Sequence, residues 1–399
     1  MPLRKQPTHL RKRRRFLLGA GVALGSLAGA SYLGLILARR SNDDLLSHVD
    51  LLHDERNRPV PALSGLKDYT GVIHVHSRVS RDCRGTPDEI ISAAKEAGFH
   101  FLFMTDHNGK KIFTEGMQGT YDGILVIRGA EMINHGQGLL AINIKEFIDG
   151  HRMTIQQAVN EIKAQGGLAF IAHPWRFKEW DVEGIDGMEI YDLADSTYAH
   201  LWKTPLMLAD EHSSDKDLPE EAFLRGPLSR PDYYLSKWDK LTQTKKFVGI
   251  AGNDAHQNTV VFGKLLDPYS VDFKFLQTHI LAPRLEATAL LQALQAGHTY
   301  CSFGMLADAS GFIFTASNSS GSLGIMGDNV PYASRPVLAA EAPRDGIMRL
   351  YRNGQLIRTE KDSRLDHAVM EKGVYRVEVA LEVEEDQYPW IFSNPIYVV

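Results

Sequence analysis

The sequence predicts an α/β protein in which a parallel βα barrel precedes an antiparallel β-sandwich. Two observations predict the barrel: from about residue 66 to 306 short apolar runs alternate with helix-like stretches, and many of these runs end in a histidine or a carboxylate. A third observation predicts the sandwich. After residue 306 the chain changes to alternating apolar and polar residues with turn signals such as Asn353-Gly354.

The composition is that of an ordinary globular protein. The chain has 399 residues, of which 44% are hydrophobic and 23% are charged, and its formal net charge is −5. Because no basic stripe follows the first forty residues, we expect no nucleic-acid partner. Cys83 and Cys301 are the only cysteines, so a metal site must be built from histidines and carboxylates.

Residues 1–40 combine a basic leader with a long apolar segment. Five basic residues, 11–15, precede Phe16–Ala38, an uncharged run long enough to span a bilayer as a helix. Residues 13–17 resemble a twin-arginine export signal, and Ala28-Gly29-Ala30 resembles a cleavage site. A cleaved signal and an uncleaved membrane anchor both stay open. Either one predicts that the rest of the chain lies outside the cytoplasm, in the periplasm or on the membrane.

The remaining elements follow in order along the chain. Residues 41–65 are polar and contain prolines, as expected of a linker. Within the barrel region, 66–306, Thr86-Pro87-Asp88-Glu89 predicts the start of a helix and Gly98 predicts its end. Residues 195–246 interrupt the alternation with charged and aromatic residues, which we interpret as a helical insertion over the sheet. Residues 307–399 form the predicted sandwich.

Five apolar runs end in residues that bind metals in proteins. His74 and His76 are two residues apart, which places them on the same side of a strand, about 6.6 Å apart along it. The strand ends of a parallel barrel meet at one face, so the groups at these ends should converge. Clustered polar groups are costly unless paired, and Zn, Mn or Fe would pair nitrogen and oxygen ligands. The other strand-end residues are Asp106, His107, Glu131, His173, Asp254 and His256.

These residues resemble the motifs of the PHP (polymerase and histidinol phosphatase) metallohydrolases over residues 66–306. The resemblance implies a distorted (βα)7 TIM-like barrel, the PHP fold, that holds two or three divalent ions. One ion would bind His74, His76, Glu131 and Asp254, a second would bind Glu131 and His173, and a third would bind Asp82, His107 and His256. The matching stretches are His74-Val75-His76-Ser77 with Asp82, Asp106-His107-Asn108, Glu131, Ala172-His173-Pro174 and Asn253-Asp254-Ala255-His256.

Two departures from the family pattern concern single residues. The second ion lacks a histidine that the family supplies, and the chain offers His135 or His151 in its place. Cys83 stands where a glycine commonly follows the first-motif aspartate, Asp82. The C-terminal region also resembles the β-sandwich tail of an exported or membrane-anchored subgroup, which is similar to carbaryl hydrolase-type enzymes.

The metal ligands and the resemblance together predict a phosphoesterase that attacks a small phosphate ester with a metal-bound hydroxide. Asp254 or Asp106 would handle the proton. Arg176 would grip the phosphate with two parallel hydrogen bonds, and Arg78, Arg81 and Arg84 are further cationic candidates.

Two alternatives remain open. The same metals could hydrolyse a carboxylic or carbamate ester in an apolar pocket, which Trp175, Phe177 and Trp180 beside His173 would favour. The chain could instead be a membrane-tethered binding module with structural metals. Structural zinc sites are normally closed and four-coordinate, whereas the ligands here suggest several open sites.

Overall fold

The computed structural model describes residues 49–53, 57–200, 228–261, 264–265, 267–383 and 386–399, with the side chains of 198–200 left out. The predicted leader at 1–40, much of the predicted linker at 41–65 and the centre of the predicted insertion lie outside these residues. Among the helices that the described ranges contain, none is both long enough and apolar enough to cross a membrane.

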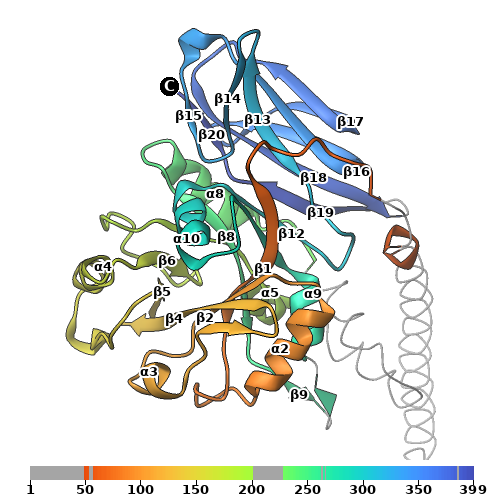
Figure 1. Ribbon diagram of the computed structural model, residues 1–399. Helices are drawn as coiled ribbons and strands as arrows, with labels where there is room; N and C mark the ends of the chain where they lie inside the picture. The colour runs from red at the N-terminus through yellow and green to blue at the C-terminus, as the bar shows by residue number, and fades with distance from the viewer. Residues whose placement is uncertain (1–48, 54–56, 201–227, 262–263, 266, 384–385) are drawn as a thin grey trace, which may run out of the picture.

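Seven strands close into a ring, which confirms the predicted barrel (Figure 1). Each strand is hydrogen-bonded to the next, and the last pairs with the first in parallel. In ring order they are β1 (Lys67–Val75), β2 (Phe101–Met104), β4 (Ile124–Asn134), β5 (Gln137–Ile142), β6 (Leu168–Ala172), β7 (Gly187–Asp192) and β8 (Val248–Ala255).

The uniform βα alternation that the sequence predicted is wrong at β5. This strand runs antiparallel to both of its neighbours, β4 and β6. A two-residue turn joins it to β4, and His135 (φ 48°) and Gly136 (φ 78°) both have the left-handed backbone that tight hairpins require. Residues 173–186, between β6 and β7, are described throughout and contain no helix. A helix after every strand is therefore not present.

Several helices lie around the strands of the ring (Figure 1). The first begins and ends as predicted: Thr86 and Glu89 form a capping box, and Gly98 follows with φ 70°. Besides the helical residues 49–53, the described ranges contain α2 (Pro87–Glu96), α3 (Lys111–Glu115), η1 (Gly150–Arg152), α4 (Ile155–Ala164), α5 (Leu193–His200), α8 (Asp232–Thr242), α9 (Tyr269–Phe275) and α10 (Ala287–Ala296). Short strands β3 (Gly119–Tyr121), β9 (Val260–Val261) and β10 (Lys264–Leu265) lie between them.

An apolar cluster joins the strands of the ring to α10. It includes Phe103, Leu140, Phe170 and Ile250 from four strands, together with Leu290 of α10, and all of these side chains are fully buried. Asp254 lies four residues after Ile250, next to the last residue of β8. Apolar packing therefore fills the ring, and polar groups collect where its strands end.

Two strands within the predicted barrel region, 66–306, lie outside the ring. β11 (Gln277–Ala282) pairs antiparallel with the first half of β1, and β12 (Thr299–Ser302) pairs antiparallel with β11. β12 also pairs with β19 (Asp386–Ser393) of the C-terminal region. Only the second half of β1, from Gly71 to Val75, pairs with β2 in the ring. The first half, from Lys67 to Gly71, pairs with β11 instead. The barrel and the C-terminal strands are thus joined by backbone hydrogen bonds.

The C-terminal strands are mainly antiparallel, as predicted, with one parallel pair between β15 and β20. The long strand β16 pairs with β13 near its start and with β18 near its end. The turn after β16 is at Asn353-Gly354, as the sequence predicted. These strands are β13 (Ile313–Asn318), β14 (Gly321–Ile325), β15 (Asn329–Val330), β16 (Val337–Arg352), β17 (Gln355–Ala368), β18 (Gly373–Val383) and β20 (Ile396–Val398), with η3 (Tyr332–Ser334) between β15 and β16.

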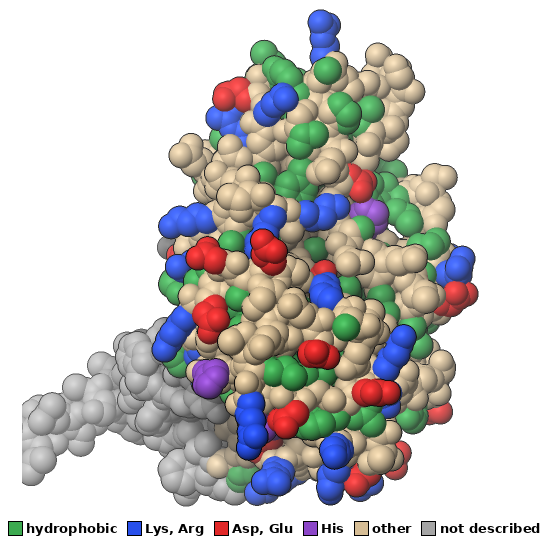
Figure 2. All heavy atoms as spheres, turned by 90° about the vertical axis from the view of Figure 1, so that its left-hand side faces the viewer, with side chains coloured by type: hydrophobic (Ala, Val, Ile, Leu, Met, Phe, Trp, Pro, Cys, Tyr) green, Lys and Arg blue, Asp and Glu red, His purple; other side chains and the backbone are tan. Residues whose placement is uncertain are grey.

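The charged side chains on one face of the molecule are mixed in sign. Figure 2 shows Lys and Arg interspersed with Asp and Glu over this face. Such mixing gives no large field of a single sign on the face shown.

Candidate metal centre

His74 and His76 lie at the end of β1, where the strand is irregular. The pairing of β1 with both β2 and β8 shifts register between Ile73 and Val75. His74, inside that irregularity, has φ 68°. Both histidines are fully buried, and their ring centroids are 5.2 Å apart. The strict two-residue period used in the sequence prediction is therefore broken at His74, yet the two rings still converge.

Three candidate ligands have a strained backbone. His74 has φ 68°, and His173 and Asp254 both have φ 48°. Such left-handed conformations cost of order 1–3 kcal/mol for residues other than glycine, and they cluster at functional sites. The fold therefore tolerates strain at the points where these side chains turn toward one another.

Asp254 lies at the centre of the cluster. Its Oδ1 is 3.2 Å from His74 Nε2, 3.3 Å from His76 Nε2 and 3.3 Å from His256 Nδ1. Ligands bound to one ion at about 2.1 Å in a tetrahedral arrangement lie roughly 3.4 Å apart. The distances around Asp254 match that spacing.

Glu131 faces two sides of the cluster with its two oxygens. Oε1 is 3.3 Å from His173 Nε2, and Oε2 is 2.8 Å from His107 Nδ1. Oε1 also lies 3.9 Å from His74 Nε2, and Oε2 lies 3.7 Å from His76 Nε2. A carboxylate in this setting can bridge two ions, which is the role that the family resemblance implies for it.

The outer side of the cluster contains the remaining candidates. His107 Nε2 is 2.9 Å from Asp82 Oδ2, and His256 Nε2 is 3.7 Å from Asp82 Oδ1. The His76 and His256 rings are stacked, with centroids 3.9 Å apart. Asp82 is 54% exposed, so this side opens to solvent. The structure thus brings all eight residues predicted as metal ligands into one contiguous cluster.

Several atoms of the cluster are buried without a hydrogen-bond partner. They are His74 Nε2, His76 Nε2, Glu131 Oε1 and Asp254 Oδ1. Leaving such groups unpaired inside a protein is costly, and a bound divalent ion would pair them. Nitrogen and oxygen donors of this kind suit Zn, Mn or Fe. Ligand atoms close enough to share an ion occur in the groups His74/His173/Asp254, His74/His76/Glu131 and His76/His107/His256.

The electrostatics of the cluster differ from one residue to the next. Burial lowers the pKa of His76 to about 4. Burial also opposes the charged form of His107, but hydrogen bonds to Glu131 and Asp82 and the charges of these carboxylates raise its pKa to about 9. The pKa of Asp254 is lowered because its histidine neighbours outweigh burial. The carboxylate form of Asp254 is therefore the one present at neutral pH.

Carboxylates that the sequence prediction did not select lie behind the histidines. His74 Nδ1 donates to Glu189 Oε1 at 2.6 Å, and His173 Nδ1 donates to Asp195 Oδ1 at 3.1 Å. The backbone N–H of His173 also donates to Glu189 Oε2 at 2.8 Å. Because an ionised carboxylate only accepts hydrogen bonds, these contacts place the proton on Nδ1 and direct the Nε2 lone pair of each ring into the cluster.

Asp192 is the third buried acid in this outer group. Its Oδ2 is 3.5 Å from His173 Nδ1 and 3.8 Å from His74 Nδ1, and it has no hydrogen-bond partner among the described residues. Burial, together with the charges of Asp195 and Glu189, raises the pKa of Asp192 well above its usual range. The sequence held a signal for these acids, since Glu189 and Asp192 interrupt an otherwise apolar strand, GMEIYD.

Asp106, which the sequence predicted for proton transfer, is engaged by the loop that follows His76. Its Oδ1 accepts the Ser77 backbone N–H at 2.7 Å and the Ser80 hydroxyl at 2.8 Å. The Ser77 hydroxyl donates to Oδ2 at 2.9 Å. Asp106 is 1% exposed and thus fixes the loop that follows His76. Both of its carboxylate oxygens therefore accept hydrogen bonds from this loop.

Arg176 is exposed beside the cluster. Its backbone N–H donates to the His173 carbonyl at 2.9 Å, and its guanidinium lies 4.6 Å from the centroid of the Trp175 ring. Arg78, Arg81 and Arg84 are also exposed. Arg176 follows the candidate ligand His173 by three residues, and Arg81 directly precedes the candidate ligand Asp82.

His135 and His151, the two candidates for the missing ligand, are not brought into the cluster. Both are exposed, and neither belongs to any metal-sized group of ligand atoms within the described ranges. His135 is fixed in the turn between β4 and β5, which explains why it does not follow Glu131 into the site.

Comparisons with known proteins give distant similarities. No family profile matches the chain. An uncharacterized protein of Methanocaldococcus jannaschii is 24% identical over 140 residues, which cover 30% of this chain and 81% of the relative. The low identity of this match leaves the family of the chain open.

Two solved structures are also similar to the chain. One is a two-domain protein of Bacteroides vulgatus containing a predicted PHP-like metal-dependent phosphoesterase, with 15% identity, a TM-score of 0.41, and coverage of 86% of this chain and 99% of that one. The other is a proposed metal-dependent phosphoesterase of Bifidobacterium adolescentis, with 14% identity, a TM-score of 0.30, and coverage of 50% of this chain and 93% of that one. Neither score is high enough to establish a shared fold.

Proposed function

We propose that the chain is a divalent-metal-dependent phosphoesterase of the PHP type. The observation that carries this proposal is the convergence of buried histidine and carboxylate atoms that have no hydrogen-bond partner, at the ends of the barrel strands. The order of the motifs along the chain supports the same family.

The residues around Asp254 and Glu131 would hold the ions. His74, His76, Glu131 and Asp254 would bind the first, and Glu131 would share the second with His173. Asp82, His107 and His256 would bind a third. Divalent ions at such a site activate water near neutral pH and neutralise charge that develops on a phosphoryl group.

The protein's own groups would orient the reactants. Glu189 and Asp195 hold the Nδ1 protons of His74 and His173, which keeps both Nε2 atoms facing inward. Asp254 is 12% exposed and ionised, so its Oδ2 is the candidate to accept a proton. Arg176, exposed near His173, would bind two phosphate oxygens through its planar fork.

A second candidate function is hydrolysis of a carboxylic or carbamate ester at the same metals. Trp175 favours it, because this ring is 53% exposed two residues after His173. Phe177 is 3% exposed and packs against Trp180, so it belongs to the core rather than to a pocket open to substrate. The aromatic surface is thus smaller than the sequence suggested, and Arg176 covers part of it.

The location of the protein belongs to the proposal as well. From the apolar segment Phe16–Ala38 we propose export or anchoring at the cytoplasmic membrane, with the barrel outside the cytoplasm. A reporter fused after Val399 that is active only in the cytoplasm would contradict this.

A hydrolysis screen would test the proposed activity. The full chain, stripped of metal and supplied with Mn²⁺ or Zn²⁺, would be assayed on phosphomonoesters, phosphodiesters and aryl carboxylic esters. We expect metal-dependent turnover of a phosphate ester, and we expect Arg176→Lys to raise KM for it while leaving carboxylic ester hydrolysis unchanged. Turnover of carboxylic esters alone would favour the second candidate, and metal binding without turnover of any ester would favour a binding module.

A further inference from the structure

A chain of hydrogen bonds leads from His173 away from the cluster to helix α8. His173 Nδ1 donates to Asp195 Oδ1 at 3.1 Å, and the Tyr234 hydroxyl donates to Asp195 Oδ2 at 2.7 Å. Asp195 belongs to α5 and Tyr234 to α8. The two oxygens of one carboxylate therefore connect a candidate metal ligand to a tyrosine 61 positions later in the sequence.

This arrangement leaves one orientation for the His173 ring. With both oxygens of Asp195 accepting hydrogen bonds, the carboxylate cannot rotate without losing one of them. The His173 proton then stays on Nδ1, and Nε2 faces Glu131 Oε1 at 3.3 Å and Asp254 Oδ2 at 3.8 Å. Partners of this kind orient metal-binding histidines and fix their tautomers.

Helix α8 is itself held in place by buried contacts. Leu235 and Trp238 are 1% and 0% exposed, and Trp238 Nε1 donates to the Phe247 carbonyl at 2.9 Å, just before β8. Tyr234 thus stands on a helix that packs directly against the barrel.

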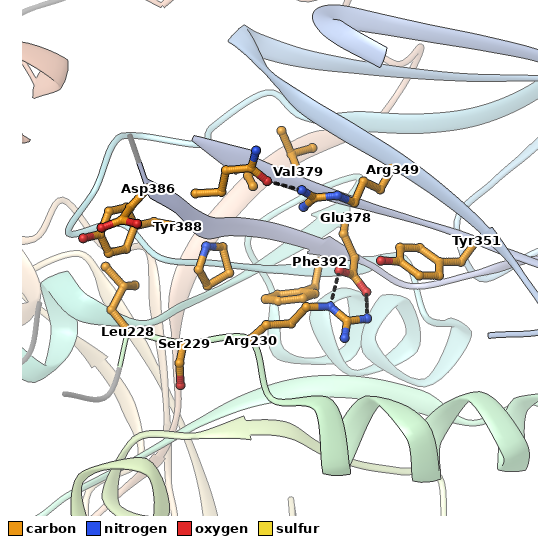
Figure 3. Close-up of a pocket in the computed structure, with 13 residues that line it drawn as sticks. Leu228, Ser229, Arg230, Arg349, Tyr351, Glu378, Val379, Asp386, Tyr388 and Phe392 are labelled. Carbon is orange, nitrogen blue, oxygen red and sulfur yellow. Dashed lines mark hydrogen bonds and ion pairs between the residues drawn. The ribbon is translucent and has the colours of Figure 1, made fainter. Parts of the chain in front are cut away.

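The C-terminal sheet fixes the same helix from the other side. Arg376 of β18 makes two parallel hydrogen bonds to Asp239 of α8, at 2.6 and 2.8 Å. Arg230, just before α8, makes two to Glu378 of β18, at 2.7 and 2.8 Å. Figure 3 shows the Arg230–Glu378 pair beside Tyr351, at the wall of a cavity of about 550 Å³.

Each of the two ion pairs in this contact has one side chain that is shielded from water, whereas Arg230 is 34% exposed. The side chains of Arg376 and Glu378 are 3% and 4% exposed. Breaking a buried pair leaves an uncompensated charge, so such two-pronged contacts hold their elements firmly in register. Asp239 lies five residues after Tyr234, little more than one turn along α8.

We propose that Tyr234 is a positioning residue for His173, and that the C-terminal sheet, by fixing α8, forms part of the metal centre. This inference rests on the proposed function, since it treats His173 as a metal ligand. The phenol acts only as a donor here: burial and the charge of Asp195 raise the pKa of Tyr234, so its hydroxyl keeps its proton across the working pH range.

The test compares Tyr234→Phe with Tyr233→Phe in the full chain. The two substitutions are identical, but the Tyr233 side chain is 49% exposed, and its hydroxyl makes no hydrogen bond that the described residues show. Binding of Zn²⁺ to the metal-free protein would be measured by competition with a chromogenic chelator, and the melting temperature of the metal-free protein would be measured in parallel. We expect Tyr234→Phe to lower the affinity for one Zn²⁺ ion by about tenfold, and Tyr233→Phe to leave the affinity unchanged.

A third variant tests the contribution of the sheet. Arg376→Lys replaces the two parallel hydrogen bonds to Asp239 by the contact of a point charge, so it should weaken the binding of the same ion. In the double variant with Tyr234→Phe, the loss of Zn²⁺ affinity should be little larger than in either single variant, because both changes act through helix α8. Independent, additive losses would overturn the role of the sheet.

The outcomes separate this inference from the proposed function. Wild-type protein that binds Zn²⁺ while Tyr234→Phe binds it equally tightly would overturn the positioning role alone. A melting temperature that falls in Tyr234→Phe with Zn²⁺ affinity unchanged would also overturn it, because it would show a purely structural role. Wild-type protein that binds no Zn²⁺ would overturn both.

Discussion

The Nε2 atom of His74 lies 3.2 Å from Oδ1 of Asp254, and neither atom has a hydrogen-bond partner. Both residues also have a left-handed backbone, φ 68° for His74 and φ 48° for Asp254. The fold thus brings a lone pair and a charged oxygen together under strain at the ends of two neighbouring strands, β1 and β8. A shared cation is the simplest physical reason for such an arrangement.

Replacing Asp254 by Asn should abolish most of the activity. The change keeps the size of the side chain but removes the charge that holds the ion and accepts the proton. A positioned acid or base contributes about 10²–10⁴-fold, so we expect turnover to fall by at least that much while the far-ultraviolet circular dichroism stays the same.

A matched control exists for this substitution. Asp122 has the same backbone angle, φ 48°, but its side chain is 68% exposed and pairs with Lys95 on the surface. Asp122→Asn should leave turnover unchanged. If Asp254→Asn kept more than about a tenth of wild-type turnover with its metal content intact, Asp254 would be a turn residue rather than a catalytic one.

Glu189→Gln should lower the metal affinity, although Glu189 is not itself a proposed ligand. Glu189 accepts hydrogen bonds from His74 Nδ1 and from the His173 backbone with separate oxygens. The amide of Gln accepts through one oxygen only, so one of these donors loses its partner. We expect metal affinity to fall about 10–100-fold, measured by equilibrium dialysis at fixed free Mn²⁺. Unchanged affinity would show that Glu189 does not orient His74.

Asp68 should contribute stability that depends on pH. His279 Nδ1 and the Gly311 backbone N–H donate to it at 3.1 and 2.8 Å, near the start of β1. Burial raises the pKa of Asp68, but His279 and these hydrogen bonds outweigh burial and lower it. Its stabilisation is therefore complete above the unfolded pKa of about 4 and is lost as the pH falls through the lower, folded pKa.

Urea unfolding of Asp68→Asn would measure this effect. We expect a loss of about 2–4 kcal/mol at pH 7 that shrinks below pH 4 or so, because protonation then removes the same charge from the wild type. Asp345→Asn is the control, since it breaks an exposed pair with Arg58 and should cost under about 1 kcal/mol. A loss that is independent of pH would contradict the prediction.

Removing metal should lower the melting temperature of the wild type. An ion that binds the folded chain, at 100 times its dissociation constant, stabilises it by about 2.7 kcal/mol. Differential scanning calorimetry with and without a chelator should show this shift in the wild type and a smaller one in Asp254→Asn. Equal shifts in both proteins would place the bound ion elsewhere.

The sequence predicted the candidate ligands because their signal is local. A histidine or carboxylate directly after an apolar run marks a strand end, and parallel strands bring such ends together. This reasoning placed His173 and Asp254 near His74, and the structure has them there. The bulge at His74 was not foreseen, since the strand alternation gives no hint of a register shift.

The features that the sequence prediction missed depend on contacts distant along the chain. The stretch of β5, QGLLAI, is buried throughout, so its pattern does not show its direction. The hairpin turn before it, at His135-Gly136, was the signal available. Glu189 was overlooked because acids were sought at strand ends rather than within strands, and no local pattern connects Tyr234 to Asp195.

The metal content of the full chain tests the central claim most directly. Protein equilibrated with Zn²⁺ or Mn²⁺ and freed of excess metal would be measured by inductively coupled plasma mass spectrometry, beside a variant carrying His74→Ala and His76→Ala. We predict about two or three ions per chain in the wild type and the loss of at least one in the variant. A wild type with less than about half an ion per chain, or a variant with the same content as the wild type, would contradict the proposal that these histidines form a metal centre.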